Sequence, residues 1–393
     1  MDTKALGEFY KDKLLNEVEP FWFPRSLDTV NGGLYHCCAA DGTLVDTDKN
    51  VWAQGRMAWM LLTCYNSIEK RPEWMQYAES ALKFLEEKCV DPADGRMYFH
   101  MTADGTPIRK RRYAYSECFA AIAWAAHYGA TGEAKSAERA RHWFDIYADI
   151  NFTPGKMAPK STGNRPGENL GCRMIMIVTA QELRRYLGDA DGFYTGWIDR
   201  CIDDLQRLFL HEDIKAVLEN VAPDGSVIDH FDERVLNPGH DIEGGWFVLE
   251  EARYRGGDKK LIEIGCKMID WALERGWDKK YGGLLYYTDV YNKPVQEYWH
   301  NMKFWWPHDE ALIGTCLAYV MTGDEKYAEW HQRIHDWSFE HLQDKEHGEW
   351  FEKGNFLMTA VYHPALLLRD PRKKEEMLAD MKKIKEKIDS MEG

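Results

Sequence analysis

The sequence lacks any long hydrophobic run. No stretch of about eighteen or more apolar residues occurs in the 393 residues, so no segment has the character of a membrane-spanning helix. The first residues, Met1 to Glu8, are charged and lack the apolar core of a secretion signal. We therefore expect a cytoplasmic protein that does not associate with a membrane.

Positive charge is also in short supply. The chain has 50 Lys and Arg against 65 Asp and Glu, which gives a formal net charge of −15. Surfaces that bind nucleic acid need clustered Lys and Arg to displace phosphate counterions, so this balance argues against a nucleic-acid partner. Hydrophobic residues make up 45% and charged residues 29%, a composition typical of a folded chain.

Motifs for metals and cofactors are missing as well. The nine cysteines are scattered, with no Cys-x-x-Cys pair and no zinc-finger spacing, so we expect them to be reduced. The chain has no His-Glu-x-x-His, Gly-x-Gly-x-x-Gly, Walker A or Gly-x-Ser-x-Gly motif. Aromatic residues are abundant instead, with 16 Trp, 20 Tyr and 16 Phe. They suit either a large core or a cleft that stacks on a ligand.

A helical unit repeats five times along the chain. Each unit is an apolar stretch that ends at a Tyr, followed by a turn and a more polar stretch. The joint residues are Tyr65, Tyr128, Tyr186, Tyr254 and Tyr319, which are 63, 58, 68 and 65 residues apart. Gly with Asp or Glu at most joints is typical of a turn between antiparallel helices. The two terminal helical segments would supply a sixth pair.

The two helices of a pair differ in character. The first is apolar on nearly all faces, as in residues 114–128 and 170–183, whereas the second is amphipathic, as in residues 135–147 and 325–339. A helix that is apolar all round lies inside a fold, and one with a polar face lies outside. The repeat therefore predicts an all-α fold, an (α/α)6 barrel. An open solenoid of stacked helix pairs is the alternative architecture.

Gly-rich, strand-like segments connect successive pairs. They lie around residues 32–44, 94–106, 219–231, 282–287 and 348–351. Apolar residues that alternate around Asp-Gly predict short β-hairpins, which we expect to gather at one rim and wall a pocket there. Since no linker or change in composition divides the chain, we predict a single domain over residues 1–393.

Polar and aromatic residues recur near the start of the apolar helices. They are Trp52, Arg56, Tyr115, Glu117, Asn169, Arg173, His240, Glu243, Lys303, Trp306 and Glu310. Because charged groups are seldom buried without partners, such a ring at one end of an apolar barrel predicts a polar cavity. For Glu117 and Arg173, an internal salt-bridge network between helix ends explains the pattern equally well.

Two of the fourteen histidines are candidates for chemistry. His240 begins an apolar helix, and Glu243 lies one turn further on, where a carboxylate can orient the imidazole or share its substrate. His363 starts the last apolar helix and should face the same cavity. No third ligand lies near His240 and Glu243 in the sequence, so we predict no metal site.

Four segments jointly resemble the N-acylglucosamine 2-epimerase family, and the match covers nearly the whole chain. They are Trp52–Trp59, Pro238–Trp246, Lys303–Ala311, and His347–Phe351 followed by His363-Pro364. The resemblance implies an (α/α)6 barrel, in agreement with the repeat. It also implies an isomerase that interconverts N-acetylglucosamine and N-acetylmannosamine by inverting C2 of the open-chain sugar.

Residue roles follow from the same resemblance. His240 and His363 would be the acid/base pair that removes the C2 proton and returns one to the opposite face, since imidazole titrates near neutral pH. Arg56 and Glu310 would surround the reacting oxygens. The expected sugar-binding residues are Trp52, Tyr115, Asn169, Glu243, Lys303 and Trp306. The chemistry needs no cofactor. Some family members need a nucleotide, so activation by ATP stays open, and homodimers are usual in the family.

Other functions stay open at this point. Relatives that act on cellobiose or mannose carry a further His on the helix where this chain reads Glu168-Asn-Leu-Gly-Cys-Arg, and its absence favours the N-acyl branch. An epimerase or aldose–ketose isomerase for an unsubstituted sugar such as mannose or glucose is the nearest alternative. An (α/α)6 glycoside hydrolase, with Glu243 and Glu310 as its carboxylate pair, and a non-catalytic binding protein are more distant ones.

Overall fold

The computed structural model describes residues 1–159 and 163–350, together with residues 379, 382, 385 and 386. The chain divides into two compact units, Met1–Lys353 and Gly354–Gly393. The description below concerns the first unit. His363 lies outside the described residues, and the single domain over residues 1–393 stays a prediction.

Helices make up most of the first unit. They are α1 Thr3–Lys13, α2 Glu19–Trp22, α3 Val51–Ser67, α4 Pro72–Lys88, α5 Tyr115–Thr131, α6 Ala134–Phe152, α7 Leu170–Leu187, α8 Phe193–Asp204, α9 Pro238–Tyr254, α10 Lys259–Gly276, α11 Trp305–Thr322 and α12 Glu325–His341. Two π-helical turns, η1 Leu14–Val18 and η2 Leu205–Phe209, extend α1 and α8.

Strands are short and lie in the connections. They are β1 Cys37–Cys38, β2 Leu44–Asp46, β3 Lys49–Asn50, β4 His100–Met101, β5 Pro107–Arg109, β6 Glu168–Asn169, β7 Leu210–His211, β8 Ala216–Val217, β9 Asn220–Val221, β10 Val235–Leu236 and β11 Thr288–Asp289. All described pairings are antiparallel.

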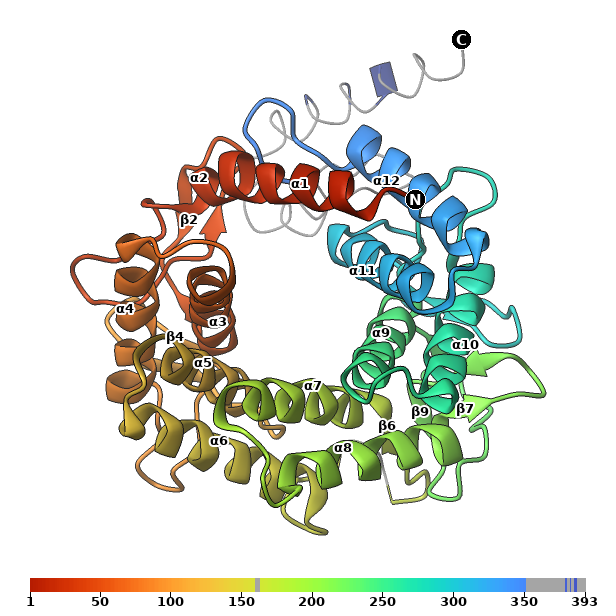
Figure 1. Ribbon diagram of the computed structural model, residues 1–393, viewed down its shortest axis with the longest axis horizontal. Helices are drawn as coiled ribbons and strands as arrows, with labels where there is room; N and C mark the ends of the chain where they lie inside the picture. Colours follow the sequence, from red (N-terminus) through yellow and green to blue (C-terminus); the bar gives the residue numbers. More distant parts are fainter. Residues whose placement is uncertain (160–162, 351–378, 380–381, 383–384, 387–393) are drawn as a thin grey trace. The chain divides into compact units, whose positions relative to one another are not determined.

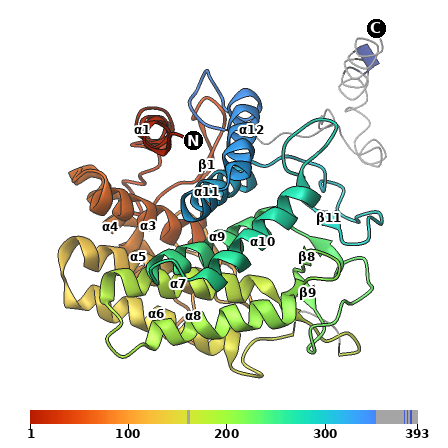
Figure 2. The ribbon, with the colours of Figure 1, turned by 45° about the vertical axis from the view of Figure 1, so that its right-hand side comes forward.

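The helices alternate between an inner and an outer layer around a ring (Figure 1). The inner layer contains α3, α5, α7, α9 and α11, each packed against the next, and each is followed by its outer partner. Figure 2 shows α10 and α12 outside α9 and α11. At the outer position before α3, α1 contacts α12, where the Tyr10 hydroxyl lies 2.9 Å from His331 Nε2. This is the predicted (α/α)6 barrel.

Side-chain character explains which helix lies inside. In α5 every residue from Ser116 to His127 is buried, because inner helices contact neighbours on all sides. The outer helix α10 buries residues such as Leu261, Ile264 and Met268 on one face and leaves Glu263 exposed on the other. Two joints end at a glycine in the left-handed region, Gly132 with φ 72° and Gly323 with φ 69°, which lets the next helix start at once.

A loop of one design recurs between outer and inner helices. It begins at Asp28, Asp91, Asp278 and Asp344, and in each copy the Asp carbonyl accepts the amide of a Gly four residues on. In three copies a lysine binds the Asp carboxylate: Lys49 to Asp28 at 2.7 Å, Lys110 to Asp91 at 2.7 Å and Lys303 to Asp278 at 2.6 Å.

The same three loops are fixed to the inner helices by a second bond. In each case a polar side chain near the start of the inner helix accepts a hydrogen bond from a buried backbone amide of the loop. The bonds are Leu34 N to Gln54 at 2.7 Å, Met97 N to Glu117 at 3.0 Å and Leu284 N to His308 at 2.9 Å. These bonds position the start of α3, α5 and α11.

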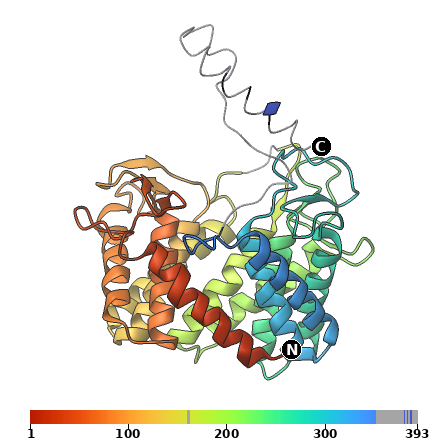
Figure 3. The same cartoon turned by 90° about the horizontal axis from the view of Figure 1, so that it is seen from above.

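Long connections and strands gather at one end of the helices (Figure 3). The predicted hairpins around residues 32–44 and 94–106 are present as β1–β2 and β4–β5. Around Asp224-Gly225 the chain makes the predicted turn, with Gly225 N donating to Ala222 O. There β9 pairs with β6, which lies far away in the sequence, and not with the residues that follow the turn. Around Leu284 a single bridge to Trp277 replaces the predicted hairpin.

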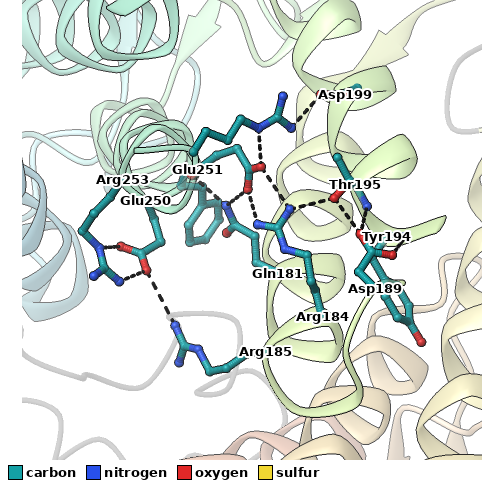
Figure 4. A network of polar contacts seen from close by, with 12 residues as sticks. Gln181, Arg184, Arg185, Asp189, Tyr194, Thr195, Asp199, Glu250, Glu251 and Arg253 are labelled. Carbon is teal, nitrogen blue, oxygen red and sulfur yellow. Dashed lines mark hydrogen bonds and ion pairs between the residues drawn. The ribbon is translucent and has the colours of Figure 1, made fainter. Parts of the chain in front are cut away.

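A buried ion-pair network joins the other ends of α7 and α9 (Figure 4). Arg184 holds the Glu251 carboxylate through two bonds of 3.0 and 2.5 Å, and Gln181 donates to the Phe247 carbonyl at 3.0 Å. The Glu251 side chain is fully buried, and its burial acts against ionisation, but the two arginines that bind it hold its pKa below the ordinary value. The network therefore ties α7 to α9 far from His240.

Within the described ranges, none of the helices is both long enough and apolar enough to cross a membrane.

Candidate active site

His240 lies at the start of α9, at the end of the barrel where the strands gather. The Asn237 side chain caps this helix by accepting the amides of Gly239 and His240 at 3.0 and 3.2 Å. Gly239 is required here, because a Cβ on it would lie 2.6 Å from the Trp306 ring. The Trp306 ring in turn lies 5.3 Å from the imidazole of His240, centre to centre.

Glu219 binds the imidazole, a contact that the sequence analysis did not predict. His240 Nδ1 lies 2.8 Å from Glu219 Oε1. Because an ionised carboxylate only accepts hydrogen bonds, Nδ1 carries the hydrogen. The side chain of His240 remains 37% exposed, so Nε2 is the nitrogen left for a substrate.

The charges around His240 favour its protonated form. Burial acts against the imidazolium, but Glu219, by its charge and hydrogen bond, together with Glu243 and Asp241, outweighs burial and raises the pKa of His240 to about 9. At neutral pH His240 is therefore an acid, able to give a proton from Nε2.

Two further carboxylates on inner helices belong to the same electrostatic group. Burial first, and then the charge of Glu243, raises the pKa of Glu310 to about 8, although Trp246 and Arg56 act in the opposite direction. Burial likewise raises the pKa of Glu243, against the influence of His240 and Arg56. Trp246 Nε1 donates to Glu310 Oε2 at 2.6 Å and so joins α9 to α11.

Aromatic residues flank Arg56 on α3. The guanidinium of Arg56 lies 5.5 Å from the centre of the Phe119 ring, on which Trp52 also stacks at 5.2 Å. Tyr115 meets Trp52 edge-on at 6.2 Å, and burial holds its pKa well above the ordinary value, so it is a neutral phenol. The indole N–H of Trp52 is buried and has no hydrogen-bond partner within the described part of the chain.

The structure thus brings together most of the residues expected from the sequence. Electrostatic coupling links His240, Glu243, Glu310 and Arg56, while Trp306 contacts His240. Trp246 and Glu219 are the two members that sequence reasoning missed. Trp246 stands in one of the family-like segments, and Glu219 begins the turn segment around Asp224-Gly225, but neither pattern indicates a contact with an acid or an imidazole.

Two of the expected sugar-binding residues have protein partners. Lys303 is only 1% exposed and binds Asp278, so it belongs to the repeated loop. Asn169 gives its amide hydrogens to the Glu219 carbonyl at 3.2 Å and to Asn220 Oδ1 at 2.9 Å. Direct binding of sugar by either residue stays a prediction.

The structure favours the salt-bridge explanation for the other two polar positions. Glu117 is buried against Arg96 at 3.0 Å, and Arg173 binds Glu168 at 2.7 Å and Asp204 at 3.3 Å. Among the described residues no group of three or more His, Cys, Asp or Glu side chains is placed to hold a metal ion.

Comparison with known proteins identifies the family of this chain. The N-acylglucosamine 2-epimerase family matches residues 33–364. The N-acylglucosamine 2-epimerase of Bos taurus is 33% identical over 355 residues, covering 87% of this chain and 83% of the bovine one. The cellobiose 2-epimerase of Dictyoglomus turgidum is 25% identical over 374 residues, covering 90% and 92%.

The fold is also that of solved structures. Cellobiose 2-epimerase from Bacillus thermoamylovorans superposes with a TM-score of 0.77 at 21% identity, covering 89% of this chain and 92% of that one. At this identity the likeness bears on the fold alone. The match to the family over residues 33–364, with the 33% identity to the bovine enzyme, places this protein in the N-acylglucosamine 2-epimerase family.

Proposed function

We propose that the protein interconverts N-acetylglucosamine and N-acetylmannosamine by inverting C2 of the open-chain sugar. The observation that carries the proposal is the imidazole of His240, which a carboxylate holds at Nδ1 and which is partly exposed beside Trp306. The similarity to the bovine N-acylglucosamine 2-epimerase supports the choice of an N-acyl sugar.

The reaction moves one proton off C2 and another onto it. In the open-chain sugar the C1 aldehyde acidifies the C2–H bond, and removal of this proton gives an enolate whose negative charge lies largely on O1. A base on one face takes the proton, and an acid on the other face returns one, so that no atom is lost. We assign these roles to His240 and His363, with His240 as the acid when the enzyme is at rest, because its pKa is raised to about 9.

The developing negative charge on O1 needs stabilisation. Arg56 supplies positive charge, and a donor of this kind typically contributes about 3–4 kcal/mol to the transition state. Glu310, whose pKa is raised to about 8, is protonated at neutral pH and can donate a hydrogen bond to the same oxygen. Glu243 is coupled to both His240 and Arg56, and we assign it to a sugar hydroxyl.

Aromatic side chains give the sugar its contact surface. Trp306 offers its ring beside His240, and the indole N–H of Trp52, which has no partner among the described residues, can donate to a hydroxyl. Tyr115, at the edge of Trp52, completes this wall. We propose that Asn169 and Lys303 serve the site chiefly by fixing the backbone around it.

Proton NMR in D2O tests the reaction directly. With N-acetylglucosamine or N-acetylmannosamine as substrate, we expect the other epimer to appear with deuterium at C2. His240→Asn should abolish both conversion and exchange. If neither sugar is converted and neither exchanges its C2 proton, an N-acyl substrate is excluded. Parallel samples with glucose, mannose and an oligosaccharide would then identify an alternative epimerase, isomerase or hydrolase. Samples with and without ATP test activation.

We also propose that the enzyme works in the cytoplasm, as a homodimer and without a cofactor. All nine cysteines are unpaired, in keeping with a reducing compartment. Light scattering on the purified protein measures the oligomeric state, and full activity after dialysis against a chelator tests the independence from metal.

A further inference from the structure

Glu219 is the one carboxylate that forms a hydrogen bond with His240 within the described residues. Glu243 lies one helical turn from His240, a spacing that allows it either to orient the imidazole or to share its substrate, and in the structure it acts on the imidazole through its charge. Glu219 comes from outside the inner helices, immediately before β9, and its Oε1 lies 2.8 Å from Nδ1. Its side chain is only 14% exposed, so bulk water does not compete strongly for this bond.

The backbone of Glu219 is itself held by two hydrogen bonds to its carbonyl oxygen. Its carbonyl accepts the Leu170 amide at 2.9 Å and the Asn169 side chain at 3.2 Å. The same Asn169 side chain donates to Asn220 Oδ1 at 2.9 Å, and the two asparagines are opposite each other in the β6–β9 pair. The strand pair therefore holds Glu219 beside the start of α7, the inner helix that packs against α9.

We infer that Glu219 is a positioning residue for His240, which keeps the hydrogen on Nδ1 and presents Nε2 to the sugar, and that Asn169 acts through Glu219. This inference rests on the proposed function only for its kinetic consequence. A carboxylate that binds one imidazole nitrogen sets the tautomer and orientation of the ring and stabilises the imidazolium that forms during proton transfer.

Other charged groups also face the imidazole, so Glu219 accounts for only part of the rise in the pKa of His240. Asp241 and Glu243 on α9 add negative charge, while α11 presents the uncharged ring of Trp306. Arg56 on α3 and Glu310 on α11 couple to Glu243. Removal of the charge of Glu219 alone should therefore lower the pKa of His240 without returning the ring to a neutral environment.

Two substitutions separate the charge of Glu219 from its hydrogen bond. Glu219→Gln keeps an acceptor for Nδ1 but removes the charge, so the alkaline limb of the pH profile of kcat/KM should move down by about one pH unit. Glu219→Leu removes both and should lower kcat by ~10²-fold or more, with a smaller change in KM. Glu168→Gln is the matched control, since Glu168 is on β6 of the same strand pair but binds Arg173.

Imidazole NMR gives a readout that does not need activity. In protein labelled with 15N-histidine, His240 is assigned by its loss in His240→Asn, and we expect an Nδ1–H form that titrates well above the ordinary range. In Glu219→Gln the titration should move to lower pH, and in Glu168→Gln it should not. An unchanged titration and pH profile in Glu219→Gln, or a wild-type His240 with hydrogen on Nε2 only, would overturn the inference.

The two proposals can fail separately. If the wild-type enzyme neither converts nor exchanges an N-acyl sugar while the His240 signal behaves as expected, the proposed function fails and the role of Glu219 stands. If the wild-type enzyme is active but the titration of His240 is the same in Glu219→Gln, the proposed function stands and the role of Glu219 fails.

Discussion

Glu310 is a buried acid whose ionisation the fold opposes. Its pKa is raised to about 8, first by burial and then by the charge of Glu243. This value lies above the ordinary value of about 4.3 for a free Glu, so the protonated form is the one that the folded state prefers. Its contribution to stability is complete below about pH 4 and is lost as the pH rises through 8.

Replacement of Glu310 should therefore change the pH dependence of stability. We predict that Glu310→Gln is more stable than the wild type at pH 9 by roughly 1–3 kcal/mol and differs little from it at pH 5. Urea denaturation at pH 5, 7 and 9 measures the free energy of unfolding. The exposed Glu329, replaced in the same way, is the control. A difference between Glu310→Gln and wild type that is constant with pH would contradict the prediction.

At the scale of structural elements, the repeated loop explains why a histidine, His308, stands near the site without taking part in the chemistry. His308 lies two residues before Glu310 and two after Trp306, but it is fully buried, and burial lowers its pKa to about 4. Its Nδ1 donates to the Phe304 carbonyl at 2.7 Å and its Nε2 accepts the Leu284 amide at 2.9 Å. In the first copy of the loop, Gln54 accepts the corresponding amide.

This equivalence predicts which substitution the protein tolerates. His308→Gln retains an acceptor for the Leu284 amide and should lower the free energy of unfolding by less than about 1 kcal/mol. His308→Leu leaves that amide buried without a partner and should cost about 1–3 kcal/mol more. Chemical denaturation of the two variants measures the difference, and equal losses of stability would show that the amide bond is not the reason for a polar residue at this position.

For the molecule as a whole, the burial of the cysteines reflects how tightly the barrel packs. Cys89, Cys118, Cys172, Cys201 and Cys266 are buried, and Cys37, Cys38, Cys64 and Cys316 are partly exposed. Burial also raises the pKa of the Cys89, Cys118, Cys201 and Cys266 thiols, which suppresses the reactive thiolate.

We predict that a thiol reagent at pH 8 labels at most the four partly exposed cysteines of the native protein and all nine after denaturation. Mass spectrometry of the labelled protein counts and locates the modified residues, with a denatured sample as the reference. Rapid labelling of Cys118 on the inner helix α5, or of Cys201 on the outer helix α8, in native protein would mean that the two helical layers separate readily. A reductant should leave the melting temperature unchanged, because no described cysteine forms a disulfide.

The architecture can be predicted from the sequence alone, because the patterns that specify it are local. The five joints at Tyr65 to Tyr319, and the contrast between apolar and amphipathic helices, reflect the 3.6-residue period and the turn residues within each repeat. The same local pattern identified His240, as a polar group at the start of an apolar helix. It also predicted the hairpins β1–β2 and β4–β5, whose strands are close in the sequence.

Which polar residues contact each other depends instead on the packing of the folded chain. Glu219 and His240 are 21 residues apart, and Trp246 and Glu310 are 64 apart, on elements whose separation no period encodes. Glu117 and Lys303 occupy the same kind of position as His240, yet each binds a neighbouring loop. The physical reason is that a helical period fixes the direction of a side chain relative to its own helix, whereas its partner depends on how separate helices and loops pack.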